Sequence, residues 1–247
     1  MAETQRAALV TGGSSGIGLA IARALAEDGY GITLSARRPE KLTAAADGLR
    51  ADGFDVLDVP AQMTEEEDLR SLVEAHADKF GRLDVLVNNA GVGIGEALDQ
   101  LSTKKVDMQL DVNLRAVVLM TRECLPMLKE AGAEHKKALI VNTASIAGKS
   151  PQPWLSVYSA TKAAVLAWSQ SNQKEIAGSG IQVTALAPGF VDTPMTEFVK
   201  DSVGAENMIR PEDLAESVRY LLRTSPNCLV PEIVFMRPED ANEGGTP

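Results

Sequence analysis

A tyrosine and a lysine stand one helical turn apart in the stretch YSATK, as Tyr158 and Lys162. The surrounding residues, VYSATKAAVLAWSQ, have a helical pattern, so both side chains are expected on one face of a helix. A free tyrosine has a pKa of about 10, and a neighbouring ammonium group favours its ionised form. Bringing that pKa toward neutrality takes about 4 kcal/mol, which partly desolvated positive groups can supply. The pair is a candidate for proton transfer, although most such pairs only pack on a helix surface.

Further polar side chains follow two predicted strands. The stretch NTAS at 142–145 places the hydroxyl of Ser145 at one strand end, and NNAG at 88–91 ends another. The carboxyl ends of parallel strands form the edge where open α/β sheets bind ligands. Serine and asparagine also form ordinary turns, so neither stretch is decisive alone. In the second stretch, the candidates for holding a strand end open beside a flat cofactor ring are Asn89, Ala90 and Gly91.

A glycine-rich segment, TGGSSGIG at 11–18, joins the first predicted strand to a helix. Its glycines permit a sharp turn, close approach of the backbone to a pyrophosphate, and close packing of helix on strand. The amino end of the helix offers free N–H groups to phosphates. A glycine cluster can be only a tight turn, but this position in the chain favours dinucleotide binding. The candidate residues are Gly12, Ser14, Ser15, Gly16, Ile17 and Gly18.

Two arginines follow the second predicted strand, in SARRPE. An NAD site usually has an acidic residue there for the ribose hydroxyls, whereas an NADP site accommodates arginine. A guanidinium group suits bidentate contact with a phosphate. Arg37 and Arg38 therefore favour NADP(H), with Arg37 preferred, and NAD(H) stays possible. The alternative interpretation is that both arginines are solvated residues at the start of a helix.

The elements that must position these residues alternate between strand and helix patterns. Short apolar runs recur at 7–10, 31–36, 55–59, 83–87, 138–143, 181–187 and 232–236. Helical patterns separate them, such as those at 17–29 and 64–81. This alternation predicts an α/β fold of Rossmann type, a doubly wound parallel sheet with helices on both faces. We expect a single domain over 1–237 and a disordered tail over 238–247, which lacks apolar periodicity.

Composition limits the partners. The chain has 247 residues and a net charge of −10, which disfavours nucleic acid and anionic membranes as partners. Its start lacks the long apolar core of a signal peptide, and no apolar run is long enough to span a membrane. Two cysteines and two histidines offer little for a disulfide framework or a metal site, so we expect no metal. These features favour a cytoplasmic protein.

Together, these residues resemble the short-chain dehydrogenase/reductase family. The matching features are TGGSSGIG, NNAG, the serine thirteen residues before the tyrosine, YSATK, and PGFVDT at 188–193. They occur in order between about Arg6 and Arg237, nearly the whole chain. The resemblance implies about seven parallel strands, a bound pyridine nucleotide, and hydride transfer to or from a small carbonyl or alcohol substrate. It also implies a homodimer or homotetramer built through the helices around Asn113 and Tyr158.

The resemblance assigns roles to individual residues. Tyr158 would protonate the substrate carbonyl oxygen, or act as the base in the reverse direction. Lys162 would lower its pKa and hold the nicotinamide ribose, and Ser145 would hydrogen-bond the same oxygen. Asn113, which lies in a helical pattern, matches an asparagine that supports a water relay to the lysine. The segment expected at the nicotinamide end contains Pro188, Gly189, Val191 and Thr193.

Two positions depart from the family pattern. Gln62, followed by Met63, stands where many members have an aspartate against the adenine. Its amide oxygen can still accept a hydrogen bond, so we expect weaker discrimination there. Ser15 stands where many NADP-dependent members have a basic residue, which leaves more of the phosphate recognition to Arg37.

The segments 146–157 and 190–208 are expected to flank the mouth of the substrate pocket, and the second is polar enough to form a mobile lid. An apolar lining, which favours an apolar or aromatic ketone or aldehyde, is suggested by Trp154, Phe190, Met195, Phe198 and Met208. An acyl group on an acidic carrier protein is disfavoured by the net charge. Three kinds of function stay open. They are a carbonyl reductase or alcohol dehydrogenase using NADP(H) or NAD(H), a nucleotide-binding sensor or scaffold, and another nucleotide-fold enzyme such as a methyltransferase. The joint presence of Asn113, Ser145, Tyr158 and Lys162 favours the first.

Overall fold

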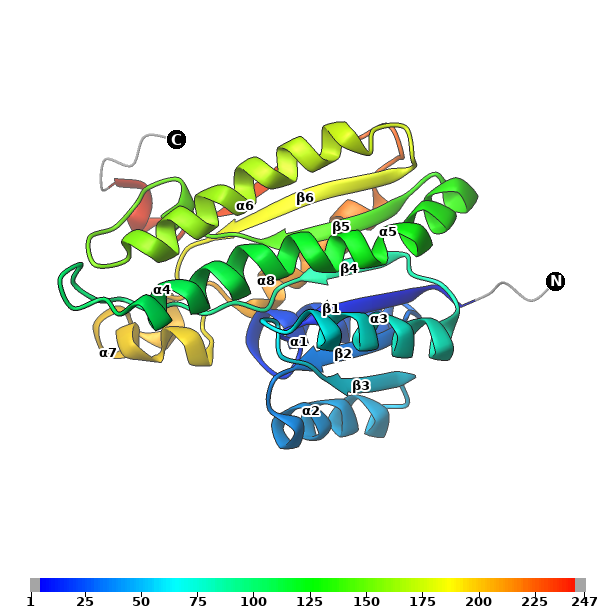
Figure 1. The fold of residues 1–247 in the computed structure, drawn as a ribbon, viewed down its shortest axis with the longest axis horizontal. Helices are drawn as coiled ribbons and strands as arrows, with labels where there is room; N and C mark the ends of the chain where they lie inside the picture. Colours follow the sequence, from blue (N-terminus) through cyan, green and yellow to red (C-terminus); the bar gives the residue numbers. More distant parts are fainter. Residues whose placement is uncertain (1–4, 243–247) are drawn as a thin grey trace.

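The computed structural model describes residues 5–242 and has seven parallel strands in one sheet (Figure 1). The strand order is β3-β2-β1-β4-β5-β6-β7, so the direction of winding reverses between β1 and β4. This confirms the predicted doubly wound parallel sheet. The strands are β1 (Ala7–Thr11), β2 (Gly31–Ala36), β3 (Val56–Pro60), β4 (Val85–Asn88), β5 (Ala138–Thr143), β6 (Ile181–Pro188) and β7 (Glu232–Phe235).

Helices cover both faces of the sheet. One face packs against α1 (Gly16–Glu27), α2 (Pro39–Ala51) and α8 (Pro211–Arg223). The other face packs against α3 (Glu66–Phe80), α5 (Ala116–His135) and α6 (Ser156–Glu175). In Figure 1 the second set lies in front of the sheet and α8 lies behind it. Two shorter helices, α4 (Thr103–Leu110) and α7 (Lys200–Val203), lie beyond the carboxyl ends of the strands (Figure 1).

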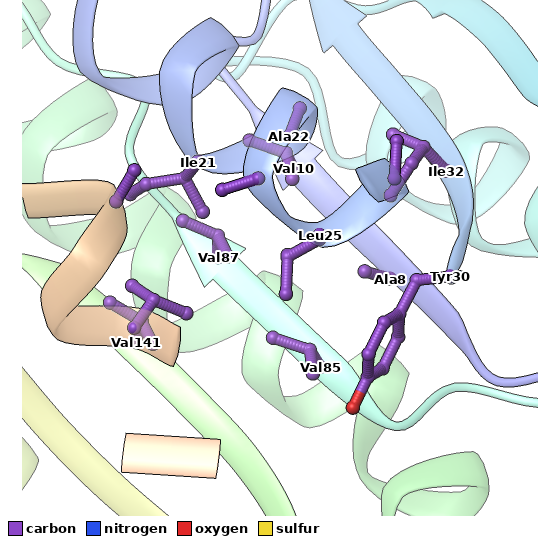
Figure 2. Packing of buried hydrophobic residues seen from close by; sticks show 14 of the residues in the cluster. Ala8, Val10, Ile21, Ala22, Leu25, Tyr30, Ile32, Val85, Val87 and Val141 are labelled. Carbon is purple, nitrogen blue, oxygen red and sulfur yellow. The ribbon is translucent and has the colours of Figure 1, made fainter. Parts of the chain in front are cut away.

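The core explains the stability of this arrangement. Strands buried on both faces are continuously apolar, and all five residues of β1 are buried. Figure 2 shows Ile21 and Leu25 of α1 packed against Val85 and Val87 of β4. On the opposite face, side chains such as Met120 of α5 belong to a second buried cluster. The sheet is thus held between two apolar layers, which fixes the strand ends relative to each other.

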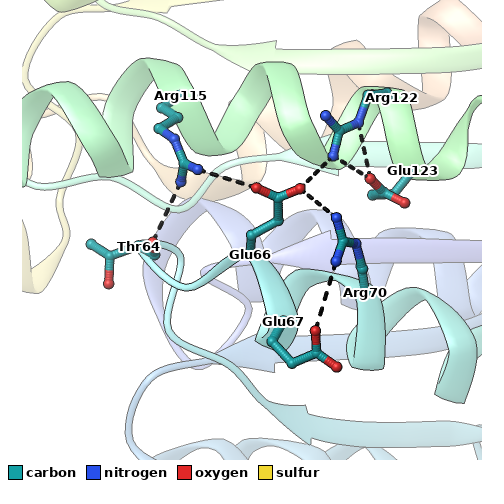
Figure 3. A network of polar contacts seen from close by, with 7 residues as sticks. All are labelled: Thr64, Glu66, Glu67, Arg70, Arg115, Arg122 and Glu123. Atoms are coloured by element: carbon teal, nitrogen blue, oxygen red, sulfur yellow. Dashed lines mark hydrogen bonds and ion pairs between the residues drawn. The ribbon is translucent and has the colours of Figure 1, made fainter.

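Charged contacts join α3 to α5 at the surface. Glu66 pairs with Arg70 on its own helix, with Arg122 on α5, and with Arg115 in the turn before α5 (Figure 3). These arginines hold the pKa of Glu66 below its usual range, and the hydrogen bond from Arg122 is the largest cause. Exposed ion pairs each contribute little to stability, typically below about 1 kcal/mol. The network links the start of α3 to Arg115 and to α5.

Several expectations concern the ends and the surface of the chain. The predicted disordered tail covers residues 238–247. Within it, Glu239–Asn242 form a short 3-10 helix, and residues 243–247 lie outside the described range. Within residues 5–242, no helix is both long and apolar enough to cross a membrane. The same residues contain no group of three histidine, cysteine, aspartate or glutamate side chains placed to hold a metal ion.

Candidate active site

The glycine loop between β1 and α1 is folded tightly against two other segments. Gly12 and Gly16 have positive φ angles, 67° and 54°, which favour glycine. A Cβ atom on Gly12 would lie 2.9 Å from Cα of Ala90, and one on Gly16 would lie 2.9 Å from Cγ2 of Thr193. The loop therefore packs so closely against Ala90 and Thr193 that a side chain at either glycine would clash.

Asn89, just beyond β4, ties this loop to the centre of the sheet. Its Nδ2 donates to the carbonyl oxygens of Thr11 and Gly12 at 3.2 and 3.3 Å. The hydroxyl of Thr11 accepts hydrogen bonds from the backbone N–H groups of Asn89 and Ala90, both at 3.1 Å. A Cβ atom on Gly18 would lie 2.5 Å from Nδ2 of Asn89. The glycine loop and the NNAG segment thus form one hydrogen-bonded unit at the point where the winding reverses.

The two arginines after β2 are exposed and make no ion pair with any described residue. Arg37 precedes α2 and Arg38 is its N-cap residue. Gln62, after β3, is exposed, while the side chain of Met63 is buried in the core beneath α3 and α5. Met63 therefore has only its backbone to offer a ligand at this edge.

Lys162 projects from α6 toward the end of β5. Its ammonium donates to the carbonyl oxygen of Thr143 at 2.7 Å, and its side chain is almost fully buried. Burial lowers the pKa of Lys162 to about 8. Its Nζ lies 5.7 Å from the centre of the Tyr158 ring. The predicted neighbours on one helix face are therefore close together, with the cation held between helix and strand.

Tyr158 is half-buried and Ser145, the N-cap of the 3-10 turn Ile146–Gly148, is buried. Burial raises the pKa of Tyr158, and its hydrogen bond with Ser145 acts in the opposite direction. The sequence predicts a lowered pKa, caused by Lys162 and the positive ring of the cofactor together. The difference arises because burial destabilises the phenolate more than the surrounding protein groups stabilise it. The hydroxyl of Ser145 also lies 3.4 Å from the carbonyl oxygen of Pro188 and accepts a hydrogen bond from Ala147.

Asn113 lies in a single turn of π-helix, Asp111–Arg115, between α4 and α5. Its Oδ1 accepts from the N–H of Val92 at 2.8 Å, and its Nδ2 donates to the carbonyl oxygen of Val92 at 2.9 Å and to Thr161 Oγ1 at 3.1 Å. The side chain is fully buried. Single π-turns often occur at functional sites. Here the turn points an amide at α6, one residue before Lys162.

Buried polar groups connect the elements that carry these residues. Nδ2 of Asn88 on β4 donates to Oδ1 of Asn142 on β5 at 2.9 Å and lies 3.2 Å from Thr121 Oγ1 on α5. Nδ2 of Asn142 donates to Ser169 Oγ on α6 at 2.9 Å. All four side chains are buried. The two strands and two helices that frame the site are therefore held in register by specific hydrogen bonds as well as by apolar packing.

The segment after β6 closes the site from the other side. Pro188 and Val191 are buried, and the carbonyl oxygen of Pro188 lies 3.4 Å from the hydroxyl of Ser145. Val191 bridges to Ile209, and Thr193 forms a capping box with Thr196 at the start of the 3-10 helix Pro194–Val199. Contact between Gly16 and Thr193 joins this segment to the glycine loop.

These residues fit a dinucleotide along the strand ends. The positive-φ glycines at 12 and 16 form a turn without side chains that leads into the amino end of α1, where a pyrophosphate would bind. At the other end, a Cβ atom on Gly91 would lie 3.4 Å from Oδ1 of Asn113 and 3.6 Å from Nζ of Lys162. A flat ring beside Gly91 would therefore lie within reach of both polar groups, with Arg37 and Arg38 at the opposite end.

The sequence patterns missed several residues that build the site. Thr11, Thr143 and Thr161 each bond a residue that the patterns singled out. Asn88 and Asn142 belong to the buried network. Thr11, Asn88, Asn142 and Thr143 occur in the motifs quoted above, so their place at strand ends was the available signal. Thr161 also lies in a quoted motif, YSATK, where the available signal was its place beside Lys162.

Comparisons with known proteins give a consistent result. The family model for short chain dehydrogenases matches residues 6–203. A relative from Staphylococcus epidermidis, an uncharacterized oxidoreductase, is 35% identical over 234 residues, which cover 95% of this chain and 97% of the relative.

Two solved structures share the fold over nearly their full length. An actinorhodin polyketide ketoreductase with NADPH is 30% identical, with a TM-score of 0.87 and coverage of 96% of this chain and 98% of that chain. A 3-ketoacyl-(acyl-carrier-protein) reductase from Brucella melitensis with NADH is 31% identical, with a TM-score of 0.85 and coverage of 95% and 99%.

Proposed function

This chain is an oxidoreductase of the short-chain dehydrogenase family, and from that premise we propose that it uses NADP(H) to interconvert a carbonyl compound and its alcohol. When bound, the nicotinamide supplies or accepts the hydride. The protein supplies orientation and one proton. The observation that carries the proposal is the convergence of Tyr158, Ser145 and Lys162 beside Gly91 and Gly93 at the carboxyl ends of β4 and β5.

In this proposal Tyr158 is the general acid. Its pKa is raised by burial, so its phenol is protonated at neutral pH and can donate to a carbonyl oxygen. Ser145, whose hydroxyl is bonded to the same phenol, donates a second hydrogen bond to that oxygen and orients it. Lys162 places a positive charge close to the phenol, which stabilises the phenolate as the proton leaves. In the reverse direction the phenolate takes the proton of the alcohol.

In this proposal Asn113 positions the backbone next to Lys162. Its amide oxygen and nitrogen both hydrogen-bond the backbone of Val92, and the nitrogen also donates to Thr161 on α6. These bonds fix the segment at Val92 relative to the helix that carries Lys162. In the family resemblance this position supports a water relay, and its proximity to Gly91 and Lys162 is compatible with that role. A relay would return a proton to Tyr158 through Lys162 after each turnover.

The preference for NADP(H) rests on Arg37 and Arg38. Both are exposed at the end of β2 without an ion-pair partner among the described residues, and no acidic residue precedes them there. A 2′-phosphate bound at the end of β2 would be attracted by two guanidinium groups and repelled by no carboxylate in the residues just before them. The glycine loop and the 188–193 segment would hold the pyrophosphate and the nicotinamide end. An NAD-linked alcohol dehydrogenase is the second candidate, because a similar fold holds NADH in the Brucella reductase.

The same proposal includes a cytoplasmic homodimer or homotetramer. Leu119 on α5 and Trp168 on α6 are only half-buried, which leaves apolar surface on the two long helices. Size-exclusion chromatography with light scattering measures the molar mass in solution and so tests the oligomeric state. A monomer at micromolar concentration would contradict it.

The test of the function is a carbonyl panel. The purified protein is mixed with NADPH or NADH and with aliphatic and aromatic ketones and aldehydes, and the absorbance of the reduced nicotinamide is followed. We expect carbonyl-dependent oxidation that is faster with NADPH. Tight cofactor binding with no oxidation of any panel member, in either direction, would instead favour a nucleotide sensor.

A further inference from the structure

Trp154 has an unusual backbone conformation for so large a residue. Its φ angle is +53°, in the left-handed region that bulky side chains rarely adopt. Its side chain is 54% exposed, so burial in the core does not compensate for this strain. Strained residues that persist are found mostly at ligand clamps and active sites. The conformation of Trp154 therefore calls for a role outside the core.

The surroundings of Trp154 are shaped to its indole. A Cβ atom on Gly95 would lie 2.2 Å from Cε3 of the indole, so the ring rests directly on the backbone of Gly95. The N–H of Glu96 donates to the carbonyl oxygen of Trp154 at 2.7 Å. These contacts join the segment after β4 to the loop before α6. They hold the ring in place although half of its surface faces solvent.

An apolar surface runs from Tyr158 to this indole. A Cβ atom on Gly93 would lie 3.8 Å from the Tyr158 ring and 3.9 Å from Sδ of Met195. Phe198, one turn after Met195, meets Trp154 edge to face with ring centres 6.4 Å apart. Met195 and Phe198 are also exposed, at 48% and 65%. Gly93 has no side chain beside the phenol, and the indole occupies the position that a side chain on Gly95 would take.

We propose that Trp154 determines specificity by holding a flat aromatic group of the substrate. This rests on the proposed function, because the carbonyl next to that group would sit at Tyr158. The indole and Phe198 present aromatic faces and edges, which pair favourably with another ring. The continuity of the surface with Tyr158 assigns it to the substrate and not to a second copy of the chain. The expected substrate class is an aryl ketone or the corresponding secondary alcohol.

Trp154→Asn is the main variant, because asparagine tolerates a positive φ better than other residues with side chains. We expect its melting temperature to be at least that of the wild type. We expect kcat/KM for acetophenone to fall about tenfold and that for 2-butanone to change less than about threefold. Phe198→Leu should show a smaller loss with acetophenone only. If Trp154→Asn does not fold, Phe198→Leu replaces it as the test of the aromatic pocket.

Binding is measured separately from turnover. Trp168→Phe leaves Trp154 as the only tryptophan, since the chain has two. Titration with acetophenone should then quench the fluorescence of Trp154 saturably, whereas non-saturable quenching would overturn the inference. Saturable quenching without turnover of either ketone would support the pocket and contradict the proposed function. Equal loss on both ketones in Trp154→Asn, or a changed oligomeric state with unchanged selectivity, would overturn the role of Trp154.

Discussion

The two sides of the site are built in different ways. On the side that we propose to be catalytic, Asn113 and Lys162 are buried and each hydrogen-bonds the backbone of another segment. On the side that we propose to bind substrate, Trp154 and Phe198 are exposed and are positioned by a glycine and by an aromatic contact. A buried polar group that loses its partner costs far more than an exposed ring that moves. The first side is therefore suited to invariant chemistry and the second to choice of substrate.

This difference predicts two kinds of mutational effect. Changes on the catalytic side should reduce turnover for every substrate. Changes on the substrate side should alter the ratio between substrates. The following variants test the first side, beginning with the largest expected effect.

Lys162→Met removes the ammonium group and keeps much of the side-chain volume. We expect kcat to fall by about 10²–10⁴, because the phenolate of Tyr158 loses its positive neighbour. KM for an aliphatic ketone should change much less. The measurement is steady-state kinetics at saturating NADPH with several ketones. A loss confined to one ketone would remove the distinction between the two sides.

The pH dependence of turnover follows from the same group. The pKa of Lys162 is lowered to about 8, so its charge is present below that pH and lost above it. The pKa of Tyr158 is raised, so the phenol stays available as an acid over this range. We expect kcat for ketone reduction to be level below pH 8 and to fall toward tenfold per pH unit above it. A level profile to pH ~10 would separate catalysis from the charge of Lys162.

Asn142→Leu tests the buried network that joins β4, β5 and α6. The substitution removes one hydrogen bond of Asn88 and one of Ser169, although Asn88 keeps Thr121 and Ser169 keeps Val165 as partners. Each buried hydrogen bond lost costs about 1 kcal/mol or more. We expect the melting temperature to fall by several degrees, with a loss of kcat smaller than in Lys162→Met. Thermal unfolding of Asn207→Leu, at an exposed asparagine, is the control. Unchanged stability in Asn142→Leu would show that apolar packing alone fixes these strands.

Arg37→Ala has the smallest expected effect, because the residue is exposed. We expect affinity for NADPH to fall about tenfold, or ~1.4 kcal/mol, and affinity for NADH to stay the same. Nicotinamide fluorescence titrations with both cofactors measure this, and Arg38→Ala is the matched control. Equal affinity of the wild-type protein for NADPH and NADH would demote both arginines to solvated surface residues and favour NAD-linked alcohol oxidation.

The sequence predicted the regular parts of the fold because they repeat a local pattern. All seven predicted strand runs overlap observed strands, and the run at 83–87 corresponds to Val85–Asn88. Strand ends also marked the motifs, since parallel strands bring them to one edge. Asn113 was different: its pattern indicated an ordinary polar helix residue, and only the family resemblance singled it out. The π-turn that buries it depends on contacts with Val92 and Thr161, which are distant in sequence.

The conformation of Trp154 could not be predicted for the same reason. Its φ is positive, and its indole occupies the place of a side chain at Gly95, which lies in a different strand–helix connection. The pKa of Tyr158 is a further example. Sequence spacing identified the nearby lysine, but the extent of burial, which sets the direction of the shift, is a property of the folded chain. Local patterns therefore identified the groups, and tertiary contacts decided their environment.

The most direct test of the account compares the wild-type protein with Tyr158→Phe, in NADPH titrations and in turnover of one ketone from the panel. The substitution removes a single hydroxyl and leaves the ring that packs near Lys162. We predict NADPH affinity within about twofold of the wild type and a loss of kcat of about 10³-fold or more. Retained turnover in Tyr158→Phe would contradict the assignment of the proton to this residue.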